Sequence, residues 1–317
     1  EKARPASCGG RAMMSVLLAT HNVADTIERT LEAMAGLDVP DGGWELLVVN
    51  NASTDDTEAR VLAWKDRLPL ACLAEPRLGK SFALNRGLSE TKGDLIVMTD
   101  DDVLPDRTWL TDIARVAALH PQCAAFGGAI VPAFEGPAPI VASSYFGLLY
   151  GASPDHGEGA IQPMRGTSLY DVSGANLTIR KSVRDAGHRF AEGYLIGRAG
   201  LMGEDTEFVR QLGASGLQIG FAPKARLRHI IHPHQTSWRW IHRRFYRHGR
   251  TAFLQARARG ESAGFPWRSL RGLPGSGLRW LLALARNDRT DAFRQSRALA
   301  YDLGALRQAF SSQGKTP

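Results

Sequence analysis

The chain has 317 residues, enough for one large domain or two small ones with a well-packed core. Its hydrophobic fraction of 44% and charged fraction of 22% are ordinary for a globular protein, and no apolar run approaches the roughly 18 residues that a membrane-spanning helix needs. The cysteines Cys8, Cys72 and Cys123 are widely spaced and match no metal-binding pattern, so we expect the reduced thiols of a cytoplasmic protein rather than disulfides.

The net charge of +7 is unevenly distributed along the chain. Residues 1–223 carry 20 Lys and Arg against 28 Asp and Glu, a net charge of −8, whereas residues 224–317 carry 19 against 4, a net charge of +15. A basic end on a mildly acidic body indicates a polyanion or an anionic membrane surface as a neighbour.

The first hundred residues alternate short apolar runs with helical patterns. Residues 1–12 are expected to form a flexible leader. Each apolar run after it has the length and composition of a strand that is buried on both faces. Between these runs lie segments with helical spacing, the first of which carries a capping-box pattern at Asp25 and Glu28. The order predicts an α/β fold with a parallel sheet and right-handed crossovers. The predicted strands are Val16–Ala19, Leu46–Val49, Leu70–Ala74 and Leu95–Met98.

Three consecutive aspartates, Asp100 to Asp102, follow the fourth predicted strand. Adjacent carboxylates repel one another, and hard divalent cations such as Mg2+ or Mn2+ take oxygen ligands and would compensate that repulsion. The carboxyl end of a strand in an open α/β sheet is also where ligands usually bind. The alternative is a solvated acidic turn that caps the next helix, predicted over Arg107–Leu119.

The regular alternation ends near residue 123. A strand is predicted over Ala124–Val131, and many prolines and glycines then indicate a loop-rich segment up to Gly166, the kind of segment that often binds substrate. Further strands, a helix that begins near Gly203 and a basic, aromatic helix follow, and residues 278–310 give one or two more helices. The further strands and the basic helix are predicted over Ser173–Arg180, Ile219–Ala222, Ala225–Ile231 and Ser237–Arg259.

Together these segments resemble a family 2 glycosyltransferase with the GT-A fold, a Rossmann-like nucleotide-binding mixed sheet flanked by helices. The resemblance lies in the order of the motifs between about residues 14 and 251. Asn50 and Asn51 replace commoner aspartates, and Gln235–Trp240 is one residue too long for the Gln-x-x-Arg-Trp of processive synthases, so a single addition is the better inference. The motifs are Ser15–Asn22, Val48–Asp55, Leu78–Gly87, Asp100–Asp102, Gly174–Asn176 and Gly203–Asp205.

The resemblance implies three units after the leader. Residues 13–131 would be the nucleotide-sugar-binding half of the GT-A domain and residues 132–235 the acceptor-binding and catalytic half. Residues 236–317 would be a basic helical C-terminal extension. The implied activity is inverting transfer of a sugar from a nucleoside diphosphate sugar, with UDP as the expected nucleotide, to a hydroxyl acceptor in polysaccharide, glycolipid or cell-envelope glycan synthesis.

The resemblance also assigns the donor side of the site. Mn2+ or Mg2+ would be bound by Asp100 and Asp102, and His229 would be a further ligand. A lone histidine is more often structural, and His232 and His234 compete with it. For the loop cations Arg77 and Lys80 a solvated position is the alternative, and for Asn50 and Asn51 an Asx turn. The expected nucleotide contacts are Thr20, Asn22, Asn50, Asn51, Arg77, Lys80, Asp100 and Asp101.

On the acceptor side, Asp205 is the expected general base, because a negative neighbour, Glu204, in a cleft makes a carboxylate more basic. With one base and no evident nucleophile on the opposite face, a single displacement should invert the anomeric configuration. Alternatively, the two acids only favour the helix dipole. The expected sugar or acceptor contacts are Gly174, Ala175, Asn176 and Glu204.

Two other classes of protein stay open. A nucleotidyltransferase also combines an α/β sheet with aspartate-bound metal, but Val16–Asn22 lacks its Gly-rich, basic signature. A catalytically inactive module that binds polyanions would explain the basic end, yet would not need Asp100, Asp102 and Asp205 together. Nucleic acid is not an expected partner, because the aromatic and basic residues of 224–317 form no recognisable nucleic-acid-binding motif.

The basic end also contains apolar side chains among its arginines, the composition of a helix that lies in a membrane interface. We therefore expect a chain that is peripheral on the inner face of a membrane, where a lipid-linked saccharide could be the acceptor. The alternative is that these side chains pack back onto the catalytic domain. The apolar side chains are Trp267, Trp280, Leu281, Leu282, Leu284, Phe293 and Phe310.

Overall fold

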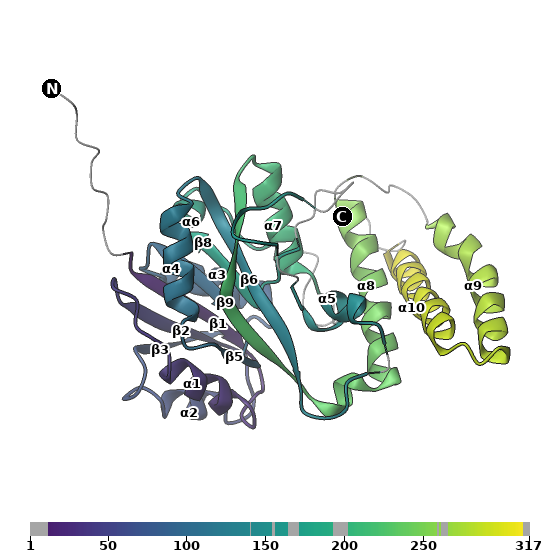
Figure 1. The fold of residues 1–317 in the computed structure, drawn as a ribbon, viewed down its shortest axis with the longest axis horizontal. Helices are drawn as coiled ribbons and strands as arrows, with labels where there is room; N and C mark the ends of the chain where they lie inside the picture. The colour runs from purple at the N-terminus through teal and green to yellow at the C-terminus, as the bar shows by residue number, and fades with distance from the viewer. Residues whose placement is uncertain are drawn as a thin grey trace.

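The structure, a computed structural model, describes residues 12–139, 141–153, 156–163, 171–192, 202–258, 260 and 266–312. A nine-stranded mixed sheet crosses the first two thirds of the chain (Figure 1). Its strands lie in the order β3-β2-β1-β4-β8-β6-β9-β5, with β7 on β9. The strands are β1 (Met14–Thr20), β2 (Trp44–Asn51), β3 (Leu70–Glu75), β4 (Leu95–Thr99), β5 (Val103–Pro105), β6 (Cys123–Phe134), β7 (Gly159–Ala160), β8 (Asn176–Arg180) and β9 (Gln218–Ile231).

The four N-terminal strands form the parallel half of the sheet. β1 pairs in parallel with β2 on one side and with β4 on the other, and β3 pairs in parallel with β2. Every residue of β1 and β4 is buried, as expected of strands covered on both faces. The predicted mixed α/β fold is confirmed, and the parallel pairing places the ends of β1, β2 and β4 at one edge.

The second half of the sheet is mixed, and its longest pairing, that of β6 with β9, is parallel. β8 runs antiparallel to β4 and to β6, and β5 runs antiparallel to β9. β9 is one strand of 14 residues where two were predicted, because the residues around Pro223 are accommodated by a register shift opposite Gly128 and Ala129. β6 continues across residue 131, so one sheet spans the boundary predicted there, and the division into two halves stays a prediction.

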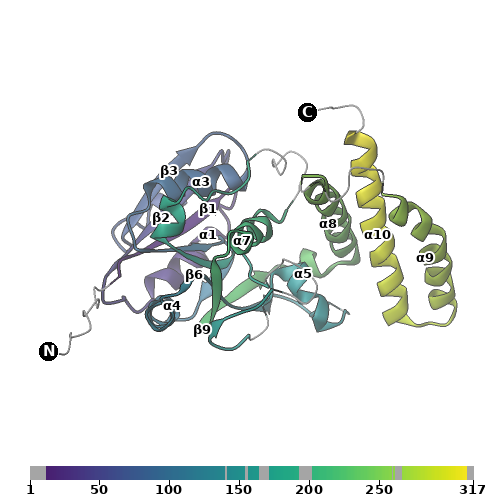
Figure 2. The ribbon, with the colours of Figure 1, turned by 90° about the horizontal axis from the view of Figure 1, so that it is seen from above.

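Helices cover both faces of this sheet, as Figures 1 and 2 show. On one face α1, α2 and α4 bury Ile27, Val61 and Trp109 against the sheet, and on the other face α3, α6 and α7 bury residues such as Leu84 and Phe208. The helices are α1 (Ile27–Ala35), α2 (Thr57–Leu62), α3 (Lys80–Glu90), α4 (Trp109–Leu119), α5 (Phe146–Tyr150), α6 (Lys181–Asp185) and α7 (Glu204–Ala214).

The capping box predicted at Asp25 and Glu28 is wrong. α1 begins at Ile27, its N-cap is Thr26, and no side chain caps it. The backbone N–H groups of the preceding residues bond instead to the segment before α2. Val23 N donates to Thr57 Oγ1 at 2.8 Å, and Ala24 N donates to an oxygen of Asp55.

Three helices form the predicted C-terminal extension, α8 (Trp238–Ala258), α9 (Trp267–Ala285) and α10 (Arg289–Ser312). α8 and α10 dock on the catalytic domain through a buried aromatic and aliphatic cluster, and α9 lies outermost (Figure 2). Among the described residues, the structure contains no helix that is both long and apolar enough to cross a membrane. The docking cluster consists of Leu149, Tyr150, Ile231, Ile241, Phe245 and Phe293.

α8 and α10 approach each other closely at two glycines. A Cβ atom added to Gly249 would lie 1.9 Å from the carbonyl oxygen of Tyr301, and one added to Gly304 would lie 2.0 Å from that of Tyr246. Backbone atoms cannot move aside as a flexible side chain can, so the contact between these helices requires glycine at both positions.

We therefore expect Gly249→Ala to lower the free energy of unfolding by roughly 1–3 kcal/mol, the range for overpacking a core. Thermal and denaturant unfolding of the full chain measure it. Gly277→Ala in α9 is the matched control, because nothing lies within 4 Å of a Cβ added there. It should be neutral or stabilise by about 0.5–1 kcal/mol. A Gly249→Ala protein as stable as the parent would contradict the close contact.

Candidate active site

A cavity of about 410 Å³ lies at the edge where β1, β2 and β4 end. Parallel pairing brings Thr20 opposite Asn50, and Leu18 opposite Thr99, so the residues after these positions meet around one opening. Asp100, Asp101 and Asp102 leave β4 and lead directly into the short strand β5. The cavity is lined by Ala19, Thr20, His21, Val23, Asn51, Leu78, Gly79, Lys80, Asp100, Asp101 and Asp102.

Asp102 and His229 form a pair at this edge, because β5 pairs with β9 and sets Val103 opposite His229. His229 Nε2 lies 3.1 Å from Asp102 Oδ2, and His229 Nδ1 lies 2.6 Å from the carbonyl oxygen of Tyr150. A carbonyl only accepts, so Nδ1 carries a hydrogen and Nε2 faces the carboxylate. Burial opposes both charges, but the hydrogen bond between the two side chains prevails, lowering the pKa of Asp102 and raising the pKa of His229.

The other oxygen of Asp102 suits a cation. Asp102 Oδ1 is buried and has no hydrogen-bond partner among the described residues. A carboxylate oxygen and an imidazole nitrogen are suitable ligands for Mn2+ or Mg2+ together with phosphate oxygens. The described residues gather no cluster of three or more His, Cys, Asp and Glu side chains that could bind a metal ion. The fit to a cation therefore depends on the buried, unpartnered oxygen of Asp102, and a bound diphosphate would have to supply further ligands.

Asp101, unlike Asp102, is hydrogen-bonded to neighbouring elements of the fold. Its Oδ2 accepts a hydrogen bond of 2.7 Å from Thr20 Oγ1, and its carbonyl oxygen accepts one of 2.8 Å from Thr30 Oγ1. Burial, together with the charge of Asp102, raises the pKa of Asp101 to about 7. Thr20 and Asp101 thus tie the end of β1 to the turn after β4, beside the predicted nucleotide site.

Lys80, the first residue of α3, links the two groups of acids. Its Nζ lies 2.5 Å from Asp100 Oδ1 and 3.8 Å from Glu204 Oε1. Burial alone would lower the pKa of Lys80, but the charges of Asp100 and Glu204 raise it. Burial raises the pKa of Glu204, and its neighbour Asp205 adds to this. Lys80 therefore neutralises part of the negative charge of both groups of acids, the aspartates after β4 and the acids that begin α7.

Asp205 is oriented by backbone N–H groups. Its Oδ2 accepts a hydrogen bond of 2.7 Å from Gly174 N, and its Oδ1 accepts one of 2.7 Å from Thr206 N. A Cβ atom added to Gly174 would lie 2.6 Å from the Cβ of Asp205, so glycine is required for this approach. Gly203, with φ of 94°, turns the chain into α7 so that Glu204 and Asp205 occupy its first turn.

The asparagines of the motifs serve the surrounding loops. Asn51 Nδ2 donates to the carbonyl oxygens of Glu75 and Arg77, and its Oδ1 accepts from Gly79 N at 2.8 Å. Asn50 Oδ1 accepts from Ser53 N at 3.3 Å, one residue beyond the partner of an Asx turn, and its Nδ2 donates to Glu58 at 3.1 Å. Base contact by these two amides stays a prediction, and in the structure Asn51 positions the loop before Lys80 whereas Asn50 bonds to α2 and to the segment that leads into it.

Other predicted residues are also engaged within the protein. Asn22 Oδ1 accepts from Thr54 N at 2.8 Å. Arg77 donates to both oxygens of Glu75 and lies over the ring of Phe82. Asn176 is buried, and its Nδ2 donates to the carbonyl oxygens of Ala129 and Ala225 at 3.1 and 2.8 Å. Its buried amide supports the sheet, and acceptor contact by Gly174, Ala175 and Asn176 stays a prediction.

Sequence reasoning missed Arg244 of α8. Burial lowers the pKa of Arg244, whereas the charges of Asp205, Glu204 and Asp100 act in the opposite direction, so its guanidinium lies in the field of the site carboxylates. Its Nε donates to the carbonyl oxygen of Leu148 only at 3.5 Å, which leaves most of its donors for another partner. The signal available in the sequence was the four-residue spacing that places Trp240, Arg244 and His248 on one side of the helix.

Comparison with known proteins identifies the family. The model of Glycosyl transferase family 2 matches residues 15–186, more than half of the chain. The "Succinoglycan biosynthesis protein ExoM" of Rhizobium meliloti is 27% identical over 229 residues, which cover 71% of this chain and 69% of that protein. The "Glucosyl-3-phosphoglycerate synthase" of Mycobacterium tuberculosis is 38% identical over 103 residues, but these cover only 31% of each protein.

Solved structures share the fold at low sequence identity. The mannosyltransferase PcManGT from Pyrobaculum calidifontis, in complex with GDP-Man and Mn2+, superposes with a TM-score of 0.64 at 17% identity and covers 96% of this chain and 88% of its own. Residues 1–349 of S. aureus TarS in complex with UDP give a TM-score of 0.55 at 19% identity, covering 95% and 92%. The protein therefore belongs to glycosyltransferase family 2 and is a glycosyltransferase with a GT-A sheet and a helical C-terminal region.

Proposed function

We propose that this glycosyltransferase moves a sugar from a nucleoside diphosphate sugar, with UDP as the nucleotide, to a hydroxyl acceptor in the synthesis of a polysaccharide, glycolipid or cell-envelope glycan. The observation that carries the proposal is the position of Lys80 between Asp100 and Glu204, because it joins the predicted donor side to the residue next to the predicted base, Asp205. Similar proteins support it, since they include a succinoglycan biosynthesis protein and structures in complex with UDP or UDP-GlcNAc.

On the donor side, we propose that Asp102, His229 and Asp100 bind the diphosphate through Mn2+ or Mg2+. When bound, the cation would stabilise the negative charge of the departing nucleoside diphosphate. The buried, unpartnered Asp102 Oδ1 supports this assignment, and the PcManGT complex contains Mn2+. Lys80 can add a further positive charge near the phosphates, because its ammonium group has three donors and can bond to a phosphate oxygen as well as to Asp100.

On the acceptor side, we propose that Asp205 takes the proton of the attacking hydroxyl group. The acceptor oxygen bonds to the anomeric carbon as the bond from that carbon to the diphosphate oxygen breaks, so a single displacement inverts the configuration. The two backbone N–H groups that bind Asp205 fix its orientation for this transfer. Glu204, next to it and near Lys80, is proposed to contact the sugar.

We also propose a cytoplasmic chain that works at the inner face of a membrane, where a lipid-linked saccharide would be its acceptor. The support is the net charge of +15 over residues 224–317 and the free thiols of Cys72 and Cys123.

The first test concerns Asp205 and the reaction class. Asp205→Asn should leave the affinity for the nucleotide sugar near its original value and lower turnover at least about 10²-fold, because a general base acts in the chemical step. Turnover is measured as release of nucleoside diphosphate, and affinity by calorimetry. Loss of donor affinity without a separate defect in turnover would remove Asp205 from the base role. Release of pyrophosphate by the parent protein would instead indicate a nucleotidyltransferase.

A second prediction concerns the cation. Asp102→Asn should abolish Mn2+-dependent binding of UDP, because it removes the charge on the unpartnered buried oxygen. A thermal-shift titration with UDP, with and without Mn2+, measures this, since a ligand at one hundred times its Kd stabilises the folded state by roughly 2.7 kcal/mol. Asp106→Asn, beyond β5, is the matched control and should behave like the parent. Full activity in excess EDTA would contradict this role.

A third prediction concerns Arg244, which we propose as a positioning residue for the carboxylates of the site. Arg244→Ala should lower kcat/KM by at least about tenfold. It should also move the acidic limb of the pH–rate profile to higher pH, because a nearby cation favours ionised carboxylates and its loss makes them harder to ionise. Arg243→Ala, the exposed neighbour on α8, is the matched control. Equal profiles for the two variants would show that Arg244 has no special role.

A further inference from the structure

α9 is attached to the molecule by one side only. It packs on α10 and lies at the outer end of the three C-terminal helices, farthest from the sheet (Figures 1 and 2). Ser276 and Ala283 are its buried residues, and they are seven positions apart and therefore lie on the same side of the helix. These small residues allow close packing on α10. The larger apolar side chains of α9 lie on its other sides.

The opposite side of α9 is apolar and exposed. Leu278, Leu281 and Leu284 have exposed fractions of 60%, 59% and 52%, in a helix that would normally turn such residues toward a core. Spacings of three and four residues align most of the apolar side chains on this outward face. We call this the α9 face, and it consists of Leu270, Pro274, Leu278, Leu281, Leu282 and Ala285, with Leu284 at its border.

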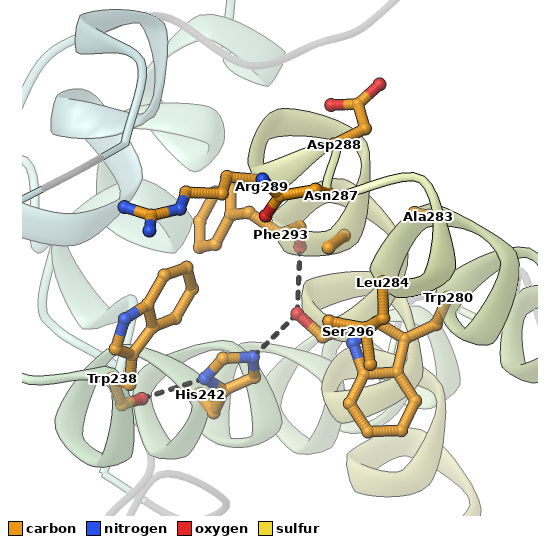
Figure 3. Close-up of a pocket in the computed structure, with 11 residues that line it drawn as sticks. Trp238, His242, Trp280, Ala283, Leu284, Asn287, Asp288, Arg289, Phe293 and Ser296 are labelled. Atoms are coloured by element: carbon orange, nitrogen blue, oxygen red, sulfur yellow. Dashed lines mark hydrogen bonds between the residues drawn. The ribbon is translucent and has the colours of Figure 1, made fainter.

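A cavity of about 370 Å³ continues this apolar surface inward (Figure 3). Its α9 wall contains Trp280 and Leu284, and Phe293 of α10 and Trp238 of α8 form part of the remaining wall. Trp280 and Leu284 both line the cavity and are exposed, with Leu284 next to the α9 face. The exposed apolar surface is therefore larger than a single helix face, and isolated surface leucines do not account for it.

The charges beside the α9 face indicate what kind of partner covers it. Residues 267–286 contain four arginines and no Asp or Glu. Arg268, Arg271 and Arg286 are exposed, whereas the exposed Asp288 and Arg289 that follow α9 add no net charge. In a dimer with twofold symmetry the same face of both copies would meet. The arginines of one copy would then lie near those of the other, and like charges repel. An anionic lipid surface, in contrast, satisfies both the arginines and the leucines.

We propose that the α9 face binds an anionic membrane surface, with Leu278, Leu281 and Leu284 below the head groups and Arg268 and Arg271 among the lipid phosphates. α9 is about 28 Å long, at 1.5 Å per residue, so the strip can lie flat on a bilayer. This inference rests on the proposed position at the inner face of a membrane and names the α9 face as the surface that contacts it. It stands apart from the catalytic proposal, because binding to vesicles is measured without turnover.

The test is sedimentation of the full chain with vesicles. The parent should bind vesicles that contain phosphatidylglycerol and phosphatidylcholine, bind those of phosphatidylcholine alone much more weakly, and dissociate as salt is raised. Leu278→Glu with Leu281→Glu should weaken this binding at least about tenfold, because two apolar anchors are lost and two negative charges added. Both positions are exposed, so the fold should persist, as circular dichroism and unfolding curves can check.

The matched control is Val39→Glu with Leu119→Glu, two exposed apolar residues of the catalytic domain, with exposed fractions of 67% and 60%. This control should bind vesicles like the parent. Undiminished binding by the α9 variant would overturn the proposal. So would a parent chain that is dimeric without lipid and becomes monomeric in the α9 variant, because a second copy would then cover the face. Equal binding to both kinds of vesicle would overturn the role of the arginines.

Discussion

Repulsion between carboxylates is the constraint on which this site depends. The turn after β4 contributes three of them and the first turn of α7 contributes Glu204 and Asp205, and Lys80 lies between the two groups. Such a cluster forms only where cations compensate it. Lys80 does so between the two groups, and His229 is hydrogen-bonded to Asp102. These contacts hold α3, which carries Lys80, and β9, which carries His229, beside the carboxylates.

The surrounding fold supplies this compensation in a fixed geometry. Asn51 bonds the backbone on both sides of the loop before α3 and so places Lys80 at the start of that helix. The pairing of β5 with β9 places His229 against Asp102. Gly174 lets the chain before β8 approach Asp205. Groups from widely separated parts of the sequence thus converge on one edge of the sheet, as the parallel strand ends of an α/β fold allow.

Much of this could be predicted from the sequence, because the pattern of the parallel half is local. Four buried apolar runs between helical segments predicted the sheet, and the predicted family is confirmed. The place of His229 was predicted only from the family resemblance, because the three-residue strand β5 that sets it beside Asp102 was not predicted. Arg244 was not found in this way, because its position depends on how α8 docks, and the spacing of Trp240, Arg244 and His248 marks one side of the helix without showing that this side faces the site. The Asp25 and Glu28 pattern failed because tertiary contacts of Val23 and Ala24 outweighed a local cap.

The most direct measurement of the central claim is the anomalous scattering of Mn2+ in crystals of the protein grown with a nucleoside diphosphate. The account predicts one strong peak between Asp102 and His229, in contact with the diphosphate oxygens, with Asp205 facing the open side of the site across from them. A diphosphate bound elsewhere on the sheet, or a Mn2+ peak distant from Asp102, would contradict the account.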